Sequence, residues 1–113
     1  MLYRTFAVFL ALVLAGPAQA TPGDHSLTDS QQLLQSCQSL SPTYRAMCLG
    51  YLAAIADDLR SDHPSKTICM PRLADLNEYR TAFIAFVEEK PELLPAPSYR
   101  SVKAALAASW PCR

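Results

Sequence analysis

The sequence has few of the residues on which nucleotide-binding loops and common catalytic motifs depend. Its 113 residues include three glycines (Gly16, Gly23, Gly50) and two histidines (His25, His63). It therefore contains no Gly-rich phosphate loop, no G-x-S-x-G nucleophile motif and no H-E-x-x-H zinc motif. We expect no catalytic residues, no cofactor and no enzyme activity.

The chain also lacks an excess of charge of either sign. Ten basic and ten acidic residues give a formal net charge of zero. Proteins that bind nucleic acid or anionic membranes depend on clustered positive charge. The composition therefore argues against both kinds of partner.

An apolar run near the N-terminus has the features of a signal peptide. Arg4 precedes the unbroken run 6–15, Gly16 and Pro17 interrupt it, and the Ala18–Ala20 stretch (AQA) has a small-x-small pattern. The run is too short for a membrane anchor, which needs roughly 20 residues. We expect cleavage after Ala20 and export of a single domain, 21–113. Because Arg4 is removed with the signal peptide, the expected mature chain has nine basic and ten acidic residues.

The four cysteines all lie in the predicted mature chain, at 37, 48, 69 and 112. An even count in a short exported protein favours two disulfides. Zinc ligands usually come in pairs two to four residues apart, whereas the spacings here are 11, 21 and 43 residues and neither histidine is adjacent. We therefore expect no metal. Of the three pairings we favour Cys37–Cys48, which would clip a helical hairpin near its turn, with Cys69–Cys112, which would close a long loop.

Apolar residues at helical spacing predict four helices with short links, and therefore an all-α domain. The first helix is expected over 29–39, with Thr28 and Gln31 as a capping box, and the second over 42–60, with Pro42 at its first position. One apolar stripe on the second helix contains Tyr44, Met47, Cys48, Tyr51, Leu52, Ile55 and Leu59. The opposite side carries Ala46, Gly50, Ala53 and Asp57. Those small residues fit either close approach by another helix or partner chain, or a solvated face.

The last two helices lie between Cys69 and Cys112. Asp75 with Glu78 forms a predicted capping box, and Pro91 ends the third helix. Its expected core face consists of Leu76, Tyr79, Phe83, Phe86 and Val87. Ser98 is the predicted cap of the fourth helix.

An ordered set of motifs resembles the Rap/Tai family of type VI secretion immunity proteins. Residues 48–57 (CLGYLAAIAD) are similar to its C-x-G-Y-[IL]-x-G-[IV]-x-D signature, with Ala54 in place of the second glycine. Residues 69–71 (CMP) are similar to its C-[IV]-P, residues 90–92 (KPE) to its H-P-E, and residues 102–112 to its terminal V-x-x-A-L…[WF]-P-C.

The resemblance implies a periplasmic, helical, disulfide-bonded protein, often a homodimer, that binds a cognate peptidoglycan amidase effector and occludes its catalytic cleft. One alternative is a small periplasmic chaperone that binds unfolded clients. Another is an orphan structural partner.

Two links are the predicted contact surfaces for the effector, because both are expected to be exposed. They span 60–66 and 93–98. The candidate contact residues are Arg60, Asp62, His63, Lys66, Leu93 and Leu94. His63 fits an exposed loop histidine better than a catalytic base.

Overall fold

The protein is a bundle of four α-helices with one short 3-10 helix. The computed structural model describes residues 28–61, 68–71 and 74–113; the predicted signal peptide and cleavage site lie outside these ranges. The elements are α1 (Ser30–Gln38), α2 (Pro42–Ser61), α3 (Leu76–Glu89), η1 (Pro91–Leu93) and α4 (Ser98–Ser109). The described residues form no strand beyond two isolated bridges. The predicted all-α class is confirmed.

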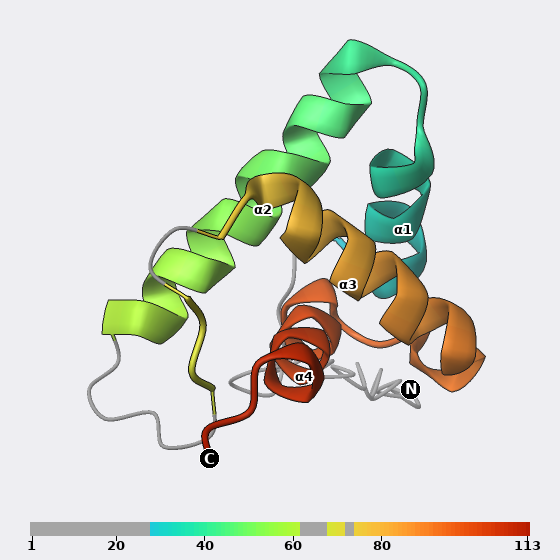
Figure 1. Cartoon of the computed structure of the whole chain (residues 1–113). Helices are drawn as coiled ribbons and strands as arrows, with labels where there is room; N and C mark the ends of the chain where they lie inside the picture. Colours follow the sequence, from blue (N-terminus) through green and yellow to red (C-terminus); the bar gives the residue numbers. More distant parts are fainter. Residues whose placement is uncertain (1–27, 62–67, 72–73) are drawn as a thin grey trace, which may run out of the picture.

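The helices meet around one apolar core. Each of the four α-helices contacts the other three, and the long α2 runs along one side of the bundle (Figure 1). The buried apolar residues are Leu33, Cys37, Cys48, Leu52, Ile55, Ala56, Leu59, Tyr79, Phe83, Val87, Val102, Ala105 and Leu106. The predicted core face of α3 is confirmed at Tyr79, Phe83 and Val87, which are buried. The other two predicted residues are less buried: Phe86 is half-buried and Leu76 is 38% exposed.

The predicted capping box of α1 is wrong by one residue. Asp29, not Thr28, is the N-cap: its carboxylate accepts the amide hydrogen of Gln32 at 2.8 Å, and the Gln32 side chain accepts from the Asp29 amide. Asp and Thr are both favourable N-cap residues, so the sequence motif alone did not show which of the two neighbouring residues begins the helix. In α3 Asp75 is the N-cap as predicted, but its carboxylate accepts from Asn77.

The link between α3 and α4 supplies hydrogen-bond acceptors to the start of α1. The first amides of a helix have no partner within it. The Ser30 amide donates to the Ala96 carbonyl at 2.9 Å, and the Gln31 amide donates to the Leu94 carbonyl at 3.0 Å. The link is therefore a structural clamp on α1.

Ser98 does not cap α4, contrary to the prediction. It is the first residue of that helix, and the N-cap position is Pro97, which makes no side-chain cap bond. The Ser98 hydroxyl is buried and donates to the Thr28 carbonyl at 2.8 Å. The serine thus ties α4 to the segment before α1.

Both favoured disulfides are present. The Cα atoms are 5.0 Å apart in Cys37–Cys48 and 4.9 Å apart in Cys69–Cys112. Beside the second bridge, the Cys69 amide donates to the Trp110 carbonyl at 2.8 Å, and the Trp110 ring packs edge-on against Tyr79 with 5.3 Å between centroids. The C-terminus is therefore held against the segment that leads into α3.

Candidate functional site

The connection between α1 and α2, together with the start of α2, carries the three large apolar side chains that are most exposed among the described residues. We call residues 38–47, which lie between the two cysteines of the first disulfide, the hairpin tip. Leu40 is 91% exposed, Tyr44 54% and Met47 59%. Soluble proteins often show single exposed apolar residues, but a cluster of them marks an interaction site.

This exposure corrects the reading of the second helix as one continuous apolar stripe. All six residues from Pro42 to Met47 are exposed, and burial begins at Cys48. The tip lies at the far end of the α1–α2 hairpin from α4, with the start of α2 at the top of Figure 1. Tyr44 and Met47 share the stripe's helical register, but no other element covers that turn.

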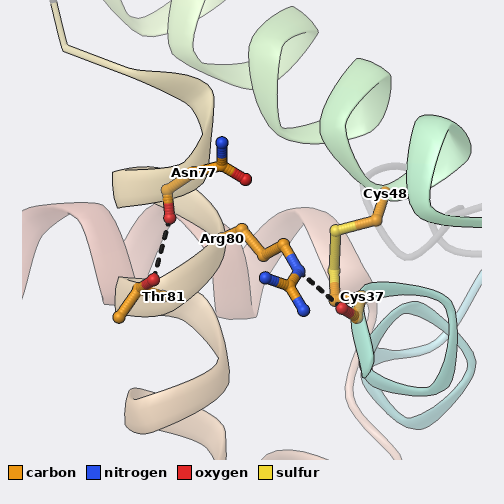
Figure 2. The surroundings of a disulfide bond; sticks show 5 residues. All are labelled: Cys37, Cys48, Asn77, Arg80 and Thr81. Atoms are coloured by element: carbon orange, nitrogen blue, oxygen red, sulfur yellow. Dashed lines mark hydrogen bonds between the residues drawn. A yellow bond between two sulfur atoms is a disulfide. The ribbon is translucent and has the colours of Figure 1, made fainter. Parts of the chain in front are cut away.

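The base of the tip is held from two sides. The Cys37–Cys48 bridge closes it, and Arg80 of α3 donates from Nε to the Cys37 carbonyl at 2.6 Å (Figure 2). Within the tip, the Ser41 amide donates to the Ser39 hydroxyl at 3.1 Å. These contacts preorganise the tip, so little conformational entropy remains to be lost when it binds.

The tip is nearly free of charge. Between Ser30 and Ala56, Arg45 is the only charged residue, although 18% of the whole chain is charged. Arg45 is exposed. The cores of protein interfaces are depleted in Lys, Asp and Glu and enriched in Tyr, Met and Arg. The tip shares this composition.

A polar hollow adjoins the apolar side chains. Its volume is about 400 Å³ and it is lined by Gln32, Gln35, Ser36, Ser39 and Tyr44. Amide and hydroxyl groups there can donate or accept hydrogen bonds. The tip therefore combines an apolar ridge with an uncharged polar flank.

A second hollow lies at the other side of the bundle. Its volume is about 450 Å³, and it is lined by Asn77, Glu78, Thr81, Ala82, Ser109 and Trp110. It is a shallow surface between α3 and the end of α4, beside the second disulfide.

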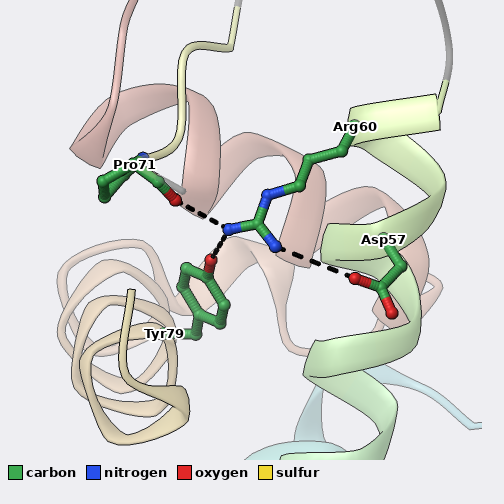
Figure 3. Close-up of polar contacts among 4 residues, drawn as sticks. All are labelled: Asp57, Arg60, Pro71 and Tyr79. Carbon is green, nitrogen blue, oxygen red and sulfur yellow. Dashed lines mark hydrogen bonds and ion pairs between the residues drawn. The ribbon is translucent and has the colours of Figure 1, made fainter. Parts of the chain in front are cut away.

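Arg60, a predicted contact residue, is engaged within the chain. One guanidinium nitrogen donates to the Pro71 carbonyl at 2.8 Å and to the Tyr79 hydroxyl at 2.5 Å, and the other lies 3.7 Å from the Asp57 carboxylate (Figure 3). The side chain joins α2 to the segment that precedes α3. The described contacts make Arg60 a structural group.

The remaining predicted contact residues fall into two groups. Asp62, His63 and Lys66 lie outside the described residues. Leu93 and Leu94 are half-buried, and Leu94 packs against the core while its carbonyl accepts from α1. Because this link adjoins the start of α1 and the tip follows its end, the two surfaces lie at opposite ends of that helix.

The small residues of α2 face away from the rest of the chain. Ala46 and Gly50 are exposed, Ala53 is half-buried, and no atom lies within 4 Å of where a Cβ would stand at Gly50. No helix of the described chain therefore makes a close approach there. The choice between a partner surface and a solvated face stays open.

Sequence reasoning did not predict the tip as a site. The available signal was the run of 27 residues, 30–56, with one charge. Helical periodicity masked it, because Leu40, Tyr44 and Met47 fit the same spacing as true core residues. The exposed residues differ from the true core residues only in whether α1 and α3 cover that part of α2.

The described side chains offer no metal centre. In that part of the chain, no group of three His, Cys, Asp or Glu residues is arranged to hold an ion. The helices that the structure describes include none with the length and hydropathy needed to cross a membrane.

The described residues form a small all-α scaffold with two disulfides and an exposed apolar tip. A family model for Rap1a immunity proteins matches residues 29–112, from the N-cap of α1 to the last cysteine. The chain belongs to this family of immunity proteins. No curated protein and no solved structure matches the chain.

Proposed function

We propose that this chain is a periplasmic immunity protein that binds a type VI secretion effector, a peptidoglycan amidase, and covers its catalytic cleft. Membership of the Rap1a immunity family over residues 29–112 is the observation that carries the proposal. An immunity protein works by binding a cognate effector, and the amidase class follows from the motif resemblance.

The cysteine chemistry supports the periplasm as the working compartment. Both disulfides are formed and the described chain has no free cysteine. Such bonds persist in oxidising compartments and are rare in the cytosol. The predicted signal peptide, cut after Ala20, would deliver the domain of residues 21–113 to that compartment. An amidase that attacks the cell wall acts in the same place.

Inhibition in this proposal needs no chemistry from the immunity protein. A scaffold held by two disulfides presents a fixed surface, and the effector loses activity because its substrate cannot enter the cleft. The affinity must then come from preformed contacts, for which the ordering cost is small.

The two predicted contact links, 60–66 and 93–98, remain proposals for the effector surface. Alanine substitutions at Asp62, His63 and Lys66 test the first link, and substitution of Leu93 tests the second. If neither set reduces protection, both links are to be dropped. Arg60 and Leu94 are poor choices for this test, because their substitution would disturb the fold.

A periplasmic chaperone is the second candidate, because the exposed Leu40, Tyr44 and Met47 could also bind unfolded clients. The two functions differ in selectivity. A chaperone suppresses aggregation of unrelated proteins at comparable molar ratios, whereas an immunity protein leaves that aggregation unchanged and blocks one effector.

Periplasmic co-expression tests the proposed function. Candidate amidases encoded near this protein's gene are exported to the periplasm with and without the chain. We expect lysis by one of them and rescue by the chain. Rescue must disappear when the chain is expressed without residues 1–20, since it then stays in the cytoplasm. If every amidase candidate lyses cells equally in the presence of the exported chain, the amidase assignment is wrong.

A further inference from the structure

We infer that the hairpin tip is the surface that binds the effector, with Leu40, Tyr44 and Met47 entering an apolar hollow of the amidase and Arg45 facing a carboxylate at its rim. This inference rests on the proposed function and adds the contact residues to it. The two predicted links do not include the tip.

The tip exposes the kinds of side chain that are common at protein interfaces. Tyr and Arg are the residues most often found at binding hot spots, and Met is enriched at interfaces. The tip places all three within four residues, 44–47, on the first turns of α2. The tip, residues 38–47, contains no Lys, Glu or Asp.

The shape and area of the tip fit a concave partner. With full side-chain areas on the order of 200 Å², the exposed fractions of Leu40, Tyr44 and Met47 leave about 400 Å² of accessible surface. A stable interface buries about 800 Å² on each partner. A convex tip reaches that area only when a concave partner also covers its polar flank, including the hollow beside Tyr44.

The charge of the tip favours an effector over a second copy of this chain as its partner. In a two-fold symmetric contact the same patch meets itself, so the patch must supply its own counter-charges. Residues 30–56 contain the cation Arg45 and no acidic residue. The Glu88 carboxylate of α3 reaches the base of the tip, where it accepts from the Gln38 side chain at 2.9 Å. A tip-to-tip dimer would desolvate two guanidinium groups without a carboxylate from either hairpin, whereas a partner of different sequence can supply one.

The rigid base makes the tip suitable for tight binding. The Cys37–Cys48 bridge and the Arg80 hydrogen bond fix the path of residues 38–47 before binding. Insertion of a rigid loop costs less ordering entropy than insertion of a mobile one. The first disulfide therefore serves recognition, in addition to stability.

The test uses the full mature chain and the amidase against which it protects cells. Tyr44→Ser, Met47→Ser and Arg45→Glu are compared with the matched controls Tyr99→Ser and Leu76→Ser. The control residues are 41% and 38% exposed and lie on α4 and α3. Affinity is measured by titration calorimetry, far-ultraviolet circular dichroism confirms folding, and sedimentation gives the oligomeric state of each variant.

We expect Tyr44→Ser to weaken binding at least about thirtyfold, as a hot-spot residue does. Arg45→Glu should weaken binding more at low salt than at high salt, because ions screen the repulsion between the introduced glutamate and the carboxylate of the effector. The two control variants should bind within about threefold of the unaltered chain, as surface substitutions outside an interface do.

Three outcomes would overturn the inference. If folded tip variants bind like the controls, the effector binds elsewhere and the proposed function stands. If the unaltered chain is a dimer that the tip variants convert to monomers without loss of amidase binding, the tip contacts a second copy. If the unaltered chain binds and protects against no amidase, the proposed function fails and this inference fails with it.

Discussion

The two disulfide-closed loops of this protein differ in what they do with their apolar residues. The long loop, 69–112, holds α3 and α4 and buries Tyr79, Phe83 and Leu106 in the core. The short loop, 37–48, leaves Leu40 and Tyr44 in solvent. The sequence of the long loop contains ten charged residues, whereas the sequence between Cys37 and Cys48 contains one.

The difference indicates a division of roles. Charged residues around the long loop keep an exposed surface soluble while its interior stabilises the fold. The short loop has almost no core of its own, so its bridge fixes the shape of a surface. Substitutions in the long loop should therefore change the free energy of unfolding, and substitutions in the short loop should change binding.

The largest effect on stability is expected from removal of the Cys69–Cys112 bridge by Cys69→Ala with Cys112→Ala. For a loop spanning 43 residues the lost chain entropy corresponds to about 4 kcal/mol of the free energy of unfolding. Urea unfolding without reductant measures the change. Molecules that remain folded should still bind the effector, because the tip is intact.

Removal of the Cys37–Cys48 bridge by Cys37→Ala with Cys48→Ala should cost less, about 3 kcal/mol for a separation of 11 residues. Affinity should also fall, since the tip is then no longer held in one conformation. Comparison of both double variants at a temperature where each is folded separates the roles. Equal affinities for the two variants would contradict the division.

Loss of one buried hydroxyl in the core should have an intermediate effect. The Ser30 hydroxyl donates to the Ala96 carbonyl at 2.9 Å, so the Ser101 hydroxyl is the donor in the 2.6 Å bond between Ser101 of α4 and Ser30 of α1. Both side chains are fully buried. Ser101→Ala should lower the free energy of unfolding by about 1 to 2 kcal/mol, because this buried hydrogen bond is lost. Thermal and urea unfolding should agree on this value, with no change in effector affinity.

A smaller effect is expected from Tyr79→Phe, which keeps the buried ring and removes the hydroxyl that accepts from Arg60. The free energy of unfolding should fall by about 1 kcal/mol. Arg60 retains the Pro71 carbonyl and Asp57, so the segment before α3 should stay in place. A loss above about 3 kcal/mol would show that the hydroxyl holds that segment alone.

The smallest effect on stability is expected at the tip. Tyr44→Ser should change the free energy of unfolding by less than about 0.5 kcal/mol, as is usual for exposed positions. A large loss of stability would show that Tyr44 belongs to the core in solution. The comparison between the loops would then no longer hold.

Most of the fold could be predicted from the sequence, because helical periodicity, proline positions and cysteine spacing are local or nearly local signals. The four helices and both cysteine pairs were predicted correctly. The α1 cap and the role of Ser98 were not, since neighbouring Thr28 and Asp29 are both competent caps, and Ser98 bonds to a residue 70 positions away.

The exposure of the hairpin tip was not predicted from the sequence, for a physical reason. Exposure depends on where helices end relative to one another, and periodicity records only which side of a helix a residue occupies. Tyr44 and Tyr51 share one stripe, yet one is 54% exposed and the other packs against the core. Arg60 is the opposite case. From the sequence it was predicted to be a surface contact residue, whereas in the structure its side chain contacts three partners within the chain.

In the proposed function this protein acts by binding alone. Titration of the purified amidase with the mature chain tests it directly, with peptidoglycan hydrolysis as the readout and mass spectrometry of the amidase as the control. We expect the hydrolytic activity to fall linearly to zero at one chain per amidase molecule, with the amidase mass unchanged. Complete inhibition at a small fraction of that ratio, or a cleaved or modified amidase, would contradict it.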